Sequence, residues 1–392
     1  MTTSLEERNI IKTVLEYSDS GETQLQPNVV LTPVARYTDP SRLKLEMATL
    51  FREFPLVLGH VSQLQEAGNF FTHNDTGVPI LVTRSPTGTV KAFINVCRHR
   101  GARVVNEPCG MANTFSCPYH GWTYDLDGHF RGMRQAEGFG DIDKSTNGLV
   151  ELPIFERFGL IWVRPSPSEK ELDIDSWLAP MEEQLGSLSL ATHSVFREWS
   201  LPRDMNWRIA LEGFLETYHF CSAHKDTACS AYLDNQSPFL DKYPHVRNAV
   251  PLARVTKLKD QDPESWQYRP NFMTQNYLFP CNFLQVMTDH VFVHTIIPTG
   301  QDTCVFKCLM LIPEAAETEK AQKYYEGNYN VVRQVFDEDF EIGEGIQAGL
   351  ATGVNANFTI GRYEAGLQLA QVAMDDALEG RLQVKTVSTE DP

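Results

Sequence analysis

The chain has 392 residues, 42% of them hydrophobic, which is enough for two domains or for one domain with a large insertion. Its 34 basic and 51 acidic residues give a formal net charge of −17, which repels nucleic acid and anionic membrane surfaces. The acidic amino terminus has no secretion-signal pattern, and no apolar run approaches the length of a membrane span. We therefore expect a cytoplasmic protein that binds neither nucleic acid nor membranes.

Residues 41–54 have the apolar spacing of a helix, and residues 78–96 are typical of two strands around a Ser-Pro-Thr-Gly-Thr turn. Short strands and glycine-containing turns continue from there, so residues 55–165 are predicted to form one small β domain. The stretch "PSPSEKE" then marks the best boundary. It leaves residues 1–54 as an N-terminal segment that packs on a second domain, residues 166–392.

The second domain mixes predicted helices and strands. Helices are expected near residues 173–188, 206–224, 318–350 and 362–379, and strands near residues 193–202, 283–300 and 302–313. This pattern predicts an α+β fold in which helices pack against an antiparallel sheet.

Cysteines are spread thinly over the chain. The eight lie at positions 97, 109, 117, 221, 229, 281, 304 and 308. A disulfide-stapled scaffold instead concentrates its cysteines in a short chain. We therefore expect reduced thiols, of which a subset binds metal.

Four potential metal ligands lie in two short loops that also contain glycine and proline. Cys97 and His99 form Cys-x-His, and after seventeen residues Cys117 and His120 form Cys-x-x-His. Two thiolates and two imidazoles can bind zinc tetrahedrally. They can also hold a two-iron, two-sulfur cluster with the cysteines on one iron and the histidines on the other. The residue types alone leave both possibilities open. Cys109 and His129 lie between or beyond these loops, and we expect a bystander thiol and a turn histidine there.

A second group of candidate ligands lies in "NWRIALEGFLETYHFCSAH", residues 206–224, which also contains Glu212. Glu216 and His219 are three residues apart and share one face of a helix. His219 and His224 are five apart, which is about 140° around a regular helix. A metal bound by both histidines therefore requires the helix to widen or end between them. For an arbitrary pair with this spacing, surface histidines are the commoner explanation.

These motifs together resemble those of the Rieske non-haem iron oxygenases, over residues from about 50 to about 350. The strings "CRHRGA" and "CPYHGWTYDLDG" resemble the Rieske cluster motif, and Ala102 and Tyr119 replace the extra cysteines of the respiratory type. Residues 206–224 resemble the N-W-K-x-x-x-E-N-x-x-E-x-Y-H-x4-H signature of the catalytic α subunit. Gly213 departs from it, because relatives commonly carry asparagine there, so a polar contact is missing or comes from another residue.

The resemblance implies a small all-β Rieske domain inserted into a helix-plus-antiparallel-sheet, helix-grip-like catalytic domain. It implies that a [2Fe-2S] Rieske cluster is held by Cys97, His99, Cys117 and His120.

The resemblance also implies that His219 and His224 bind a mononuclear non-haem Fe(II), which leaves positions open for O2 and substrate. The third ligand would be Asp339, in "VFDEDFEIGEGIQAGLATG". Its rivals are Asp337, Glu338, Glu341 and Glu344, for which the alternative is a solvated helix face. Glu216 occupies the position of the acid that bridges electron transfer to a cluster histidine of the neighbouring subunit.

The implied activity is that of the terminal oxygenase of a multicomponent system. It would use O2 and electrons from NAD(P)H to mono- or dihydroxylate, or oxidatively demethylate, a small organic substrate. The sequence shows no glycine-rich NAD or FAD fingerprint, so a separate reductase, with or without a ferredoxin, is expected. Head-to-tail homotrimers (α3) are implied, and an α3β3 assembly stays open. The alternatives are a Rieske electron carrier with a non-catalytic binding domain and a structural zinc protein.

Residue types indicate the substrate pocket only weakly. Candidates are Phe214, Phe220 and the apolar residues of "NYLFPCNFLQVM", although such residues more often form the core. Tyr277 and Phe279 are candidates for an aromatic cage around a quaternary amine.

Overall fold

Residues 3–387 are described by the computed structural model, and they form two units. The larger unit comprises residues 3–46, 180–187 and 194–382, and the smaller one comprises residues 47–179, 188–193 and 383–387. Residues 1–2 of the predicted N-terminal segment and residues 388–392 of the predicted second domain lie outside the described residues.

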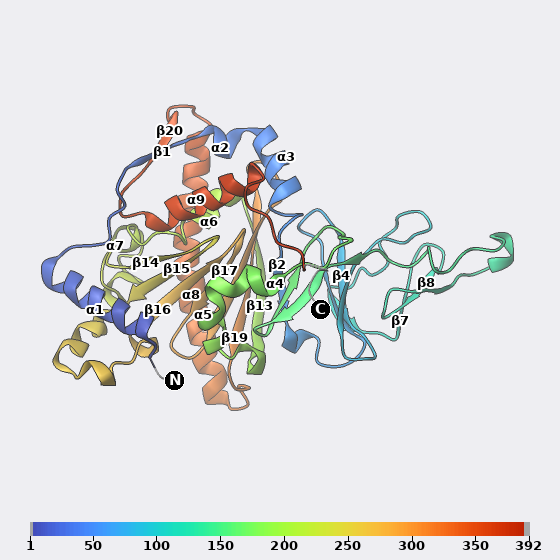
Figure 1. The fold of residues 1–392 in the computed structure, drawn as a ribbon, viewed down its shortest axis with the longest axis horizontal. Coiled ribbons are helices and arrows are strands. Elements are labelled where there is room, and N and C mark those ends of the chain that lie inside the picture. The colour runs from blue at the N-terminus through green and yellow to red at the C-terminus, as the bar shows by residue number, and fades with distance from the viewer. Residues whose placement is uncertain (1–2, 388–392) are drawn as a thin grey trace. The chain divides into compact units, whose positions relative to one another are not determined.

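An antiparallel sheet forms the centre of the larger unit (Figure 1). Its strands are β13 (Ser194–Arg203), β14 (Phe239–Lys242), β15 (His245–Pro251), β16 (Phe272–Leu278), β17 (Asn282–Val286), β18 (Val291–Pro298) and β19 (Cys304–Ile312). They lie in the order β13-β19-β18-β17-β16-β15-β14. All residues of β15 to β18 are buried, so both faces of these strands are covered.

Helices cover this sheet. Those of the larger unit are α1 (Leu5–Ser20), α2 (Ala35–Thr38), α5 (Glu182–Ser187), α6 (Trp207–Glu212), α7 (Phe220–Ala223), α8 (Glu319–Leu350) and α9 (Ala365–Leu378), and α3 (Pro40–Thr49) begins there. α6 packs on β18 and β19 and against α8, whereas α9 packs on β14 and β15. Buried side chains recur every four residues along α8 at Val332, Phe336 and Phe340, and the Phe336 ring lies 5.3 Å from that of Phe306 on β19. This spacing is that of a helix with one face against a sheet.

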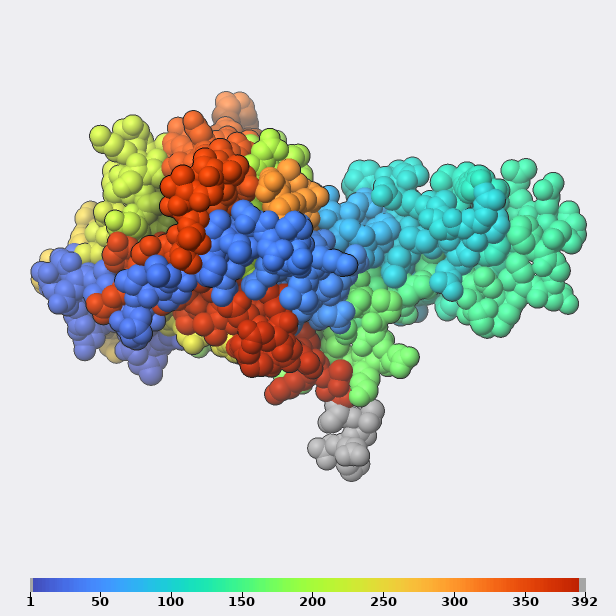
Figure 2. Space-filling model, turned by 90° about the horizontal axis from the view of Figure 1, so that it is seen from above, coloured from blue at the N-terminus to red at the C-terminus, as the bar shows by residue number. Residues whose placement is uncertain are grey.

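The N-terminal segment is built into the larger unit. α1 begins with a capping box between Ser4 and Glu7, and its buried face packs near β15 and β16. Strand β1 (Val30–Pro33) pairs with β20 (Asn357–Ile360), and Arg36 and Arg42 both form ion pairs with Asp375 of α9. Figure 2 shows this blue N-terminal segment beside the red residues of the C-terminal part.

The smaller unit consists mainly of short strands. They are β2 (Leu56–His60), β3 (Asn69–His73), β4 (Ile80–Arg84), β5 (Val90–Ile94), β6 (Cys109–Met111), β7 (Thr114–Ser116), β8 (Thr123–Asp125), β9 (Phe130–Gly132), β10 (Glu151–Leu152), β11 (Ile154–Arg157) and β12 (Leu160–Val163). They form three sheets, β10-β5-β4-β3-β6, β11-β12-β2 and β7-β8-β9. The helix α4 (Ile174–Leu178) also belongs to this unit. No helix among residues 3–387 is long and apolar enough to cross a membrane.

The predicted fold class, an all-β domain inserted into an α+β domain with an antiparallel sheet, is confirmed. The prediction of one helix over residues 206–224 is wrong, because α6 ends at Glu212 and α7 begins at Phe220. The intervening chain turns so that Phe214 packs against the rings of Phe283 and Phe306 in the sheet. The predicted helix over 41–54 also ends early, at Thr49.

Candidate metal centres

The start of α6 is fixed by a buried ionic network. Glu46 of α3 accepts from Trp207 Nε1 at 2.8 Å and from Arg208 Nε at 2.7 Å, and both Glu46 and Arg208 are 1% exposed. Buried charges are tolerated when they are paired and hydrogen-bonded in this way. The network therefore holds in place the helix that leads into the candidate ligands.

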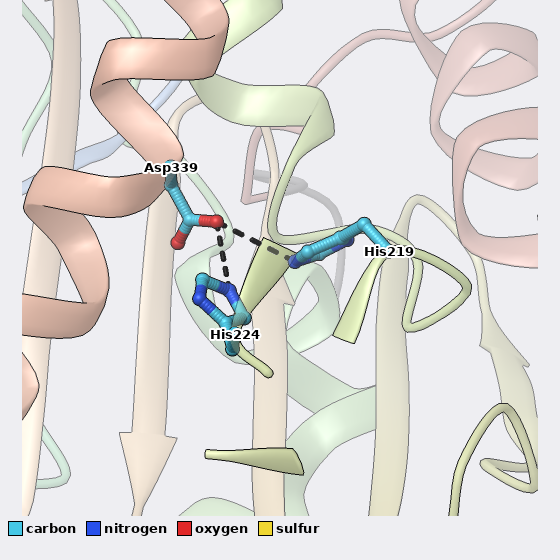
Figure 3. Close-up of side chains that lie close together, drawn as sticks. All are labelled: His219, His224 and Asp339. Atoms are coloured by element: carbon cyan, nitrogen blue, oxygen red, sulfur yellow. Dashed lines mark ion pairs between the residues drawn. The ribbon is translucent and has the colours of Figure 1, made fainter. Parts of the chain in front are cut away.

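His219, His224 and Asp339 converge in the larger unit (Figure 3). The Oδ1 atom of Asp339, on α8, lies 2.9 Å from Nε2 of His224 and 3.5 Å from Nε2 of His219. Because α7 is only four residues long, both histidines lie at its ends, where the chain is not held to a regular helical angle. The three residues thus offer two imidazole nitrogens and one carboxylate oxygen to a single ion.

A carboxylate supports the far nitrogen of each histidine. Nδ1 of His219 contacts Glu216 Oε1, and Nδ1 of His224 lies 2.8 Å from Glu338 Oε2, which also accepts from the hydroxyl of Thr227 at 2.7 Å. These contacts fix each ring with Nε2 toward Asp339. A carboxylate on the second nitrogen is the usual arrangement for a metal-binding histidine, so the residues fit a bound metal ion.

The charge at this cluster favours a cation. Burial lowers the pKa of His219, but the carboxylates of Glu216 and Asp339 outweigh it, and the pKa of His219 is raised overall. Burial likewise lowers the pKa of His224, but Asp339 and Glu338 raise it overall. A site that draws protons onto two imidazoles also attracts a metal cation.

Of the rival acids on α8, only Glu338 reaches the histidines. Asp337 forms ion pairs with Arg203 and Arg333. Glu344 accepts a hydrogen bond from the backbone of Asp204, and Glu341 is exposed.

Two cavities reach this cluster, and both are lined by Gly213, Phe214, His219 and Asp339. The larger has a volume of about 400 Å³ and is also lined by Glu212 and by the acids Glu216 and Glu364. The smaller, of about 150 Å³, is lined mainly by apolar side chains together with Gln275 and Gln285. No Lys or Arg occurs among the described residues that line either cavity.

Glu212 is a buried acid beside the larger cavity. Both of its oxygens lie within 2.9 Å of the Tyr37 hydroxyl, which donates to the carboxylate. Burial raises the pKa of Glu212 to about 7, although Arg208 and Tyr37 act in the opposite direction. Near neutral pH this carboxyl group is therefore shared between its protonated and ionised forms.

The first predicted group of ligands, the cysteines and histidines of residues 97–120, lies in two similar loops of the smaller unit. The Cys97 N–H donates to Ala102 at 2.8 Å, and the Cys117 N–H donates to Trp122 at 2.8 Å. In each loop the carbonyl of the cysteine accepts from a glycine four residues on, Gly101 or Gly121. Both glycines have positive φ, +78° and +70°, which side chains disfavour. Repetition of one loop conformation brings the two cysteines together.

The side chains of these loops meet in pairs. Both cysteines are buried at 3% exposure, whereas both histidines are half-buried. The Nδ1 atoms of His99 and His120 face each other at 3.1 Å, and the Tyr124 hydroxyl donates to Cys97 Sγ at 3.4 Å. Two inward thiols and two converging imidazoles near the surface fit a cluster with different ligands on its two irons.

The other cysteines and the turn histidine differ from these four. Cys109 is exposed on β6, and exposed His129 contacts Asp125. Cys221 and Cys229 form a disulfide, so the expectation that all cysteines outside the cluster are reduced thiols is wrong. The two residues become neighbours because α7 and the turn Cys229–Ala231 fold against each other around His224.

Sequence reasoning missed several parts of the site. Glu338 is predicted only as a rival ligand. Gln285 lies in a predicted strand, residues 283–300, and Gln275 lies in no predicted element, so neither amide is singled out by the sequence. Tyr277 and Phe279, considered as an aromatic cage, are fully buried and line neither cavity that reaches His219. Of the candidate pocket aromatics, Phe214 and Phe220 do line the smaller cavity.

Two family models match the chain. Residues 54–152 match the Rieske [2Fe-2S] domain, and residues 190–380 match the catalytic domain of the ring hydroxylating alpha subunit. The first match contains all four residues of the paired loops, and the second contains His219, His224 and Asp339.

Curated relatives include the glycine betaine monooxygenase oxygenase subunit of Chromohalobacter salexigens, 33% identical over 210 residues, which are 53% of this chain and 46% of that protein. The chloroplastic choline monooxygenase of Beta vulgaris is 26% identical over 87% of this chain and 75% of its own length. The chain spans less than half the length of the bacterial relatives that it matches, 42% to 46%.

Solved structures share the fold. A quaternary ammonium Rieske monooxygenase in complex with L-carnitine matches with a TM-score of 0.75 at 21% identity, over 88% of this chain and 96% of that one. The naphthalene 1,2-dioxygenase of Rhodococcus sp. matches with a TM-score of 0.74 at 17% identity, over 96% of this chain and 99% of that one.

Proposed function

The chain belongs to the family of Rieske non-haem iron oxygenase alpha subunits, and from this premise we propose that it is the terminal oxygenase of a multicomponent system. It would take electrons from NAD(P)H through a separate reductase, with or without a ferredoxin. With O2 it would then hydroxylate or oxidatively demethylate a small organic substrate. The observation that carries the proposal is the convergence of His219, His224 and Asp339 beside two cavities.

The proposal assigns one cofactor to each unit. Cys97, His99, Cys117 and His120 would hold the [2Fe-2S] cluster, in a Rieske domain formed by residues 55–165. His219, His224 and Asp339 would hold the mononuclear iron, in a catalytic domain formed by residues 166–392 with residues 1–54 packed on it. When bound, the cluster supplies electrons singly and the ferrous ion supplies a place where O2 is activated.

The chain's own residues then orient the ligands and exclude water. Glu216 and Glu338 hold the two imidazoles with Nε2 toward the metal position. Phe214, Phe220 and Phe336 line the smaller cavity, so a substrate there is surrounded by apolar side chains. Glu212, with its pKa of about 7, can hold or release a proton beside the larger cavity.

The assembly belongs to the proposal. We expect a head-to-tail homotrimer in which the cluster of one subunit serves the iron of the next, with Glu216 as the bridge to a cluster histidine. Sedimentation analysis that finds a monomer under turnover conditions would contradict this part. Co-purification with a smaller β chain would favour an α3β3 assembly over the homotrimer.

The deciding experiment is the metal content of the anaerobically purified protein. One cluster and one mononuclear site require three irons and two acid-labile sulfides per chain. Two irons with two sulfides would favour an electron carrier, and zinc without sulfide would favour a structural zinc protein. NADH oxidation by the isolated chain without added reductase would contradict the multicomponent system.

The His219→Ala variant separates the enzyme from the electron carrier. We expect it to keep the optical and paramagnetic signals of the cluster while it loses mononuclear iron and turnover. His129→Ala is the matched control, because this exposed histidine lies outside both candidate centres. Equal iron contents in the two variants would overturn the assignment of His219.

A further inference from the structure

We propose that the smaller cavity takes a neutral, compact molecule with a hydrogen-bond acceptor such as a carbonyl oxygen, and that Gln275 and Gln285 recognise this acceptor. The inference rests on the proposed function only insofar as the bound molecule would be the substrate. The cavity itself is defined by the chain's own residues.

The two glutamines form one polar patch. Gln275 on β16 and Gln285 on β17 are direct partners in the antiparallel register, so their side chains lie on the same face of the sheet. Both line the smaller cavity, and each is 7% exposed. Two amides thus stand next to each other in a wall that is otherwise largely apolar.

His294 fixes the orientation of Gln285. Its Nε2 lies 3.1 Å from Gln285 Oε1, whereas its Nδ1 is buried without a partner. Burial lowers the pKa of His294 to about 3, so the ring is neutral and carries one N–H. That hydrogen belongs on Nε2, because a buried N–H without a partner is costly. Gln285 therefore accepts through its oxygen, and its amide nitrogen, which lies 3.1 Å from Met273 Sδ, is the donor end.

Gln275 is oriented in the same sense. Asn248, its partner on β15, donates from Nδ2 to Gln275 Oε1 at 3.3 Å. Its oxygen thereby accepts a hydrogen bond within the protein and keeps one lone pair, whereas its amide nitrogen has two hydrogens to donate. Both glutamines consequently offer donors, and the group that suits them in a ligand is an acceptor.

The lining of the smaller cavity favours a neutral ligand over a charged one. Among the described residues around the smaller cavity, the only ionisable carboxylate or imidazole groups are His219, His224 and Asp339, which the proposed function assigns to the metal. No Lys or Arg is present to pair with a carboxylate. A buried charge without a partner is strongly disfavoured, so a neutral molecule fits best.

The volume sets the size of the ligand. An apolar cavity of about 150 Å³ accommodates a molecule of roughly benzene size. The body of the ligand would lie against Met273, Met287, Val332 and Phe336, whereas exposed Val331 marks where the cavity reaches the surface. A single ring or a short branched chain fits this space, and a fused polycyclic system does not.

Four ligands of nearly the same size and shape test the inference. Acetophenone carries a neutral acceptor, α-methylstyrene replaces its oxygen with a methylene group, benzoate is anionic, and benzamidinium is cationic. Calorimetric titration of the holoprotein should show acetophenone binding about threefold to tenfold more tightly than α-methylstyrene, the range expected for one net hydrogen bond. Benzoate and benzamidinium should bind more than about tenfold more weakly than acetophenone.

Two variants identify the residues responsible. Gln275→Leu should abolish the preference for acetophenone over α-methylstyrene, and Gln285→Leu provides a second test if the first variant folds poorly. Thr274→Val is the matched control, because Thr274 precedes Gln275 on β16 and its side chain bonds Tyr268 on the opposite face. The control should keep the parent's preference.

Three outcomes would overturn the proposal: a charged ligand that binds as tightly as acetophenone, an unchanged preference in both glutamine variants, or no binding of any of the four. Repetition after chelation of the iron shows whether a ligand binds the metal directly. Because these titrations need no turnover, they separate the two proposals. A protein with the expected binding order but without iron would retain the cavity inference and lose the oxygenase function.

Discussion

Glu338 and Asp339, adjacent on α8, contact opposite nitrogens of the His224 ring: Glu338 Oε2 lies 2.8 Å from Nδ1, and Asp339 Oδ1 lies 2.9 Å from Nε2. Removal of the charge in Glu338→Gln should lower the affinity for iron about 10- to 100-fold, because a carboxylate on the far nitrogen orients the ring and strengthens the ligand. Competition with a chelator measures the affinity. Glu341→Gln, at an exposed position on the same helix, is the control, and equal iron retention in both variants would contradict this role.

The choice of Asp339 as third ligand is testable against its neighbour Asp337. Asp339→Ala should remove the mononuclear iron while the absorption of the cluster is unchanged. Asp337→Ala should keep all the iron and lose at most about 1 kcal/mol of stability, because its ion pairs with Arg203 and Arg333 are exposed. Iron analysis of both variants checks the assignment, and iron loss in Asp337→Ala instead would reverse it.

Glu212 makes stability depend on pH. Its pKa is raised to about 7 by burial, so between about pH 4.5 and 7 the folded chain keeps a proton that the unfolded chain releases. The contribution of this group to stability therefore falls as pH rises through that window. Glu212→Gln removes this ionisation. Between pH 5 and pH 8 the free energy of unfolding of the parent should therefore fall by up to about 3 kcal/mol more than that of the variant. Urea unfolding at both pH values, at equal iron content, measures the difference. The same pH dependence in parent and variant would show that Glu212 does not titrate in this range.

The disulfide between Cys221 and Cys229 closes a short loop that contains His224. Replacement of both cysteines by serine should lower the free energy of unfolding by about 2 to 3 kcal/mol, because the unfolded chain regains the freedom that the cross-link removed. Chemical unfolding with and without a thiol reductant measures this. The reductant should destabilise the parent by a similar amount and leave the double variant unchanged. A parent that is insensitive to reductant while the double variant is destabilised would rule out loss of the cross-link as the cause.

The sequence predicts which residues form the candidate metal sites better than it predicts where helices break. The paired loops are recognisable from the spacing of their ligands, Cys-x-His from Cys97 and Cys-x-x-His from Cys117. In the larger unit, periodicity predicts the long helix α8 and the strands β13, β17, β18 and β19, which lie close to their expected ranges. The strands β14, β15 and β16 correspond to no predicted element. The break in the helix after Glu212 is not predicted. Helix propensity is a weak signal, and here the packing of Phe214 into the sheet decides the path of the chain.

The remaining parts of the site depend on contacts between distant segments. Glu338 meets His224 across 114 residues, and nothing in an acid-rich helix distinguishes it from Glu341 until the fold is known. Gln275 and Gln285 are recognisable as a polar pair only once the strand register is known, because the register makes them neighbours. The contact of His294 with Gln285 likewise appears only in the fold. The long N-terminal helix α1 was overlooked, although the capping box of Ser4 and Glu7 was visible in the sequence.

Gly213 lines both cavities, and a β-carbon added there would meet only the carbonyl oxygen of Ala210, at 4.0 Å. Its backbone has φ of −58° and ψ of −24°, which any residue adopts without strain. A β-carbon therefore fits at this position, and a single substitution can place a side chain beside both cavities. Such a change would alter which molecules fit beside the iron position while His219, His224 and Asp339 stay as they are.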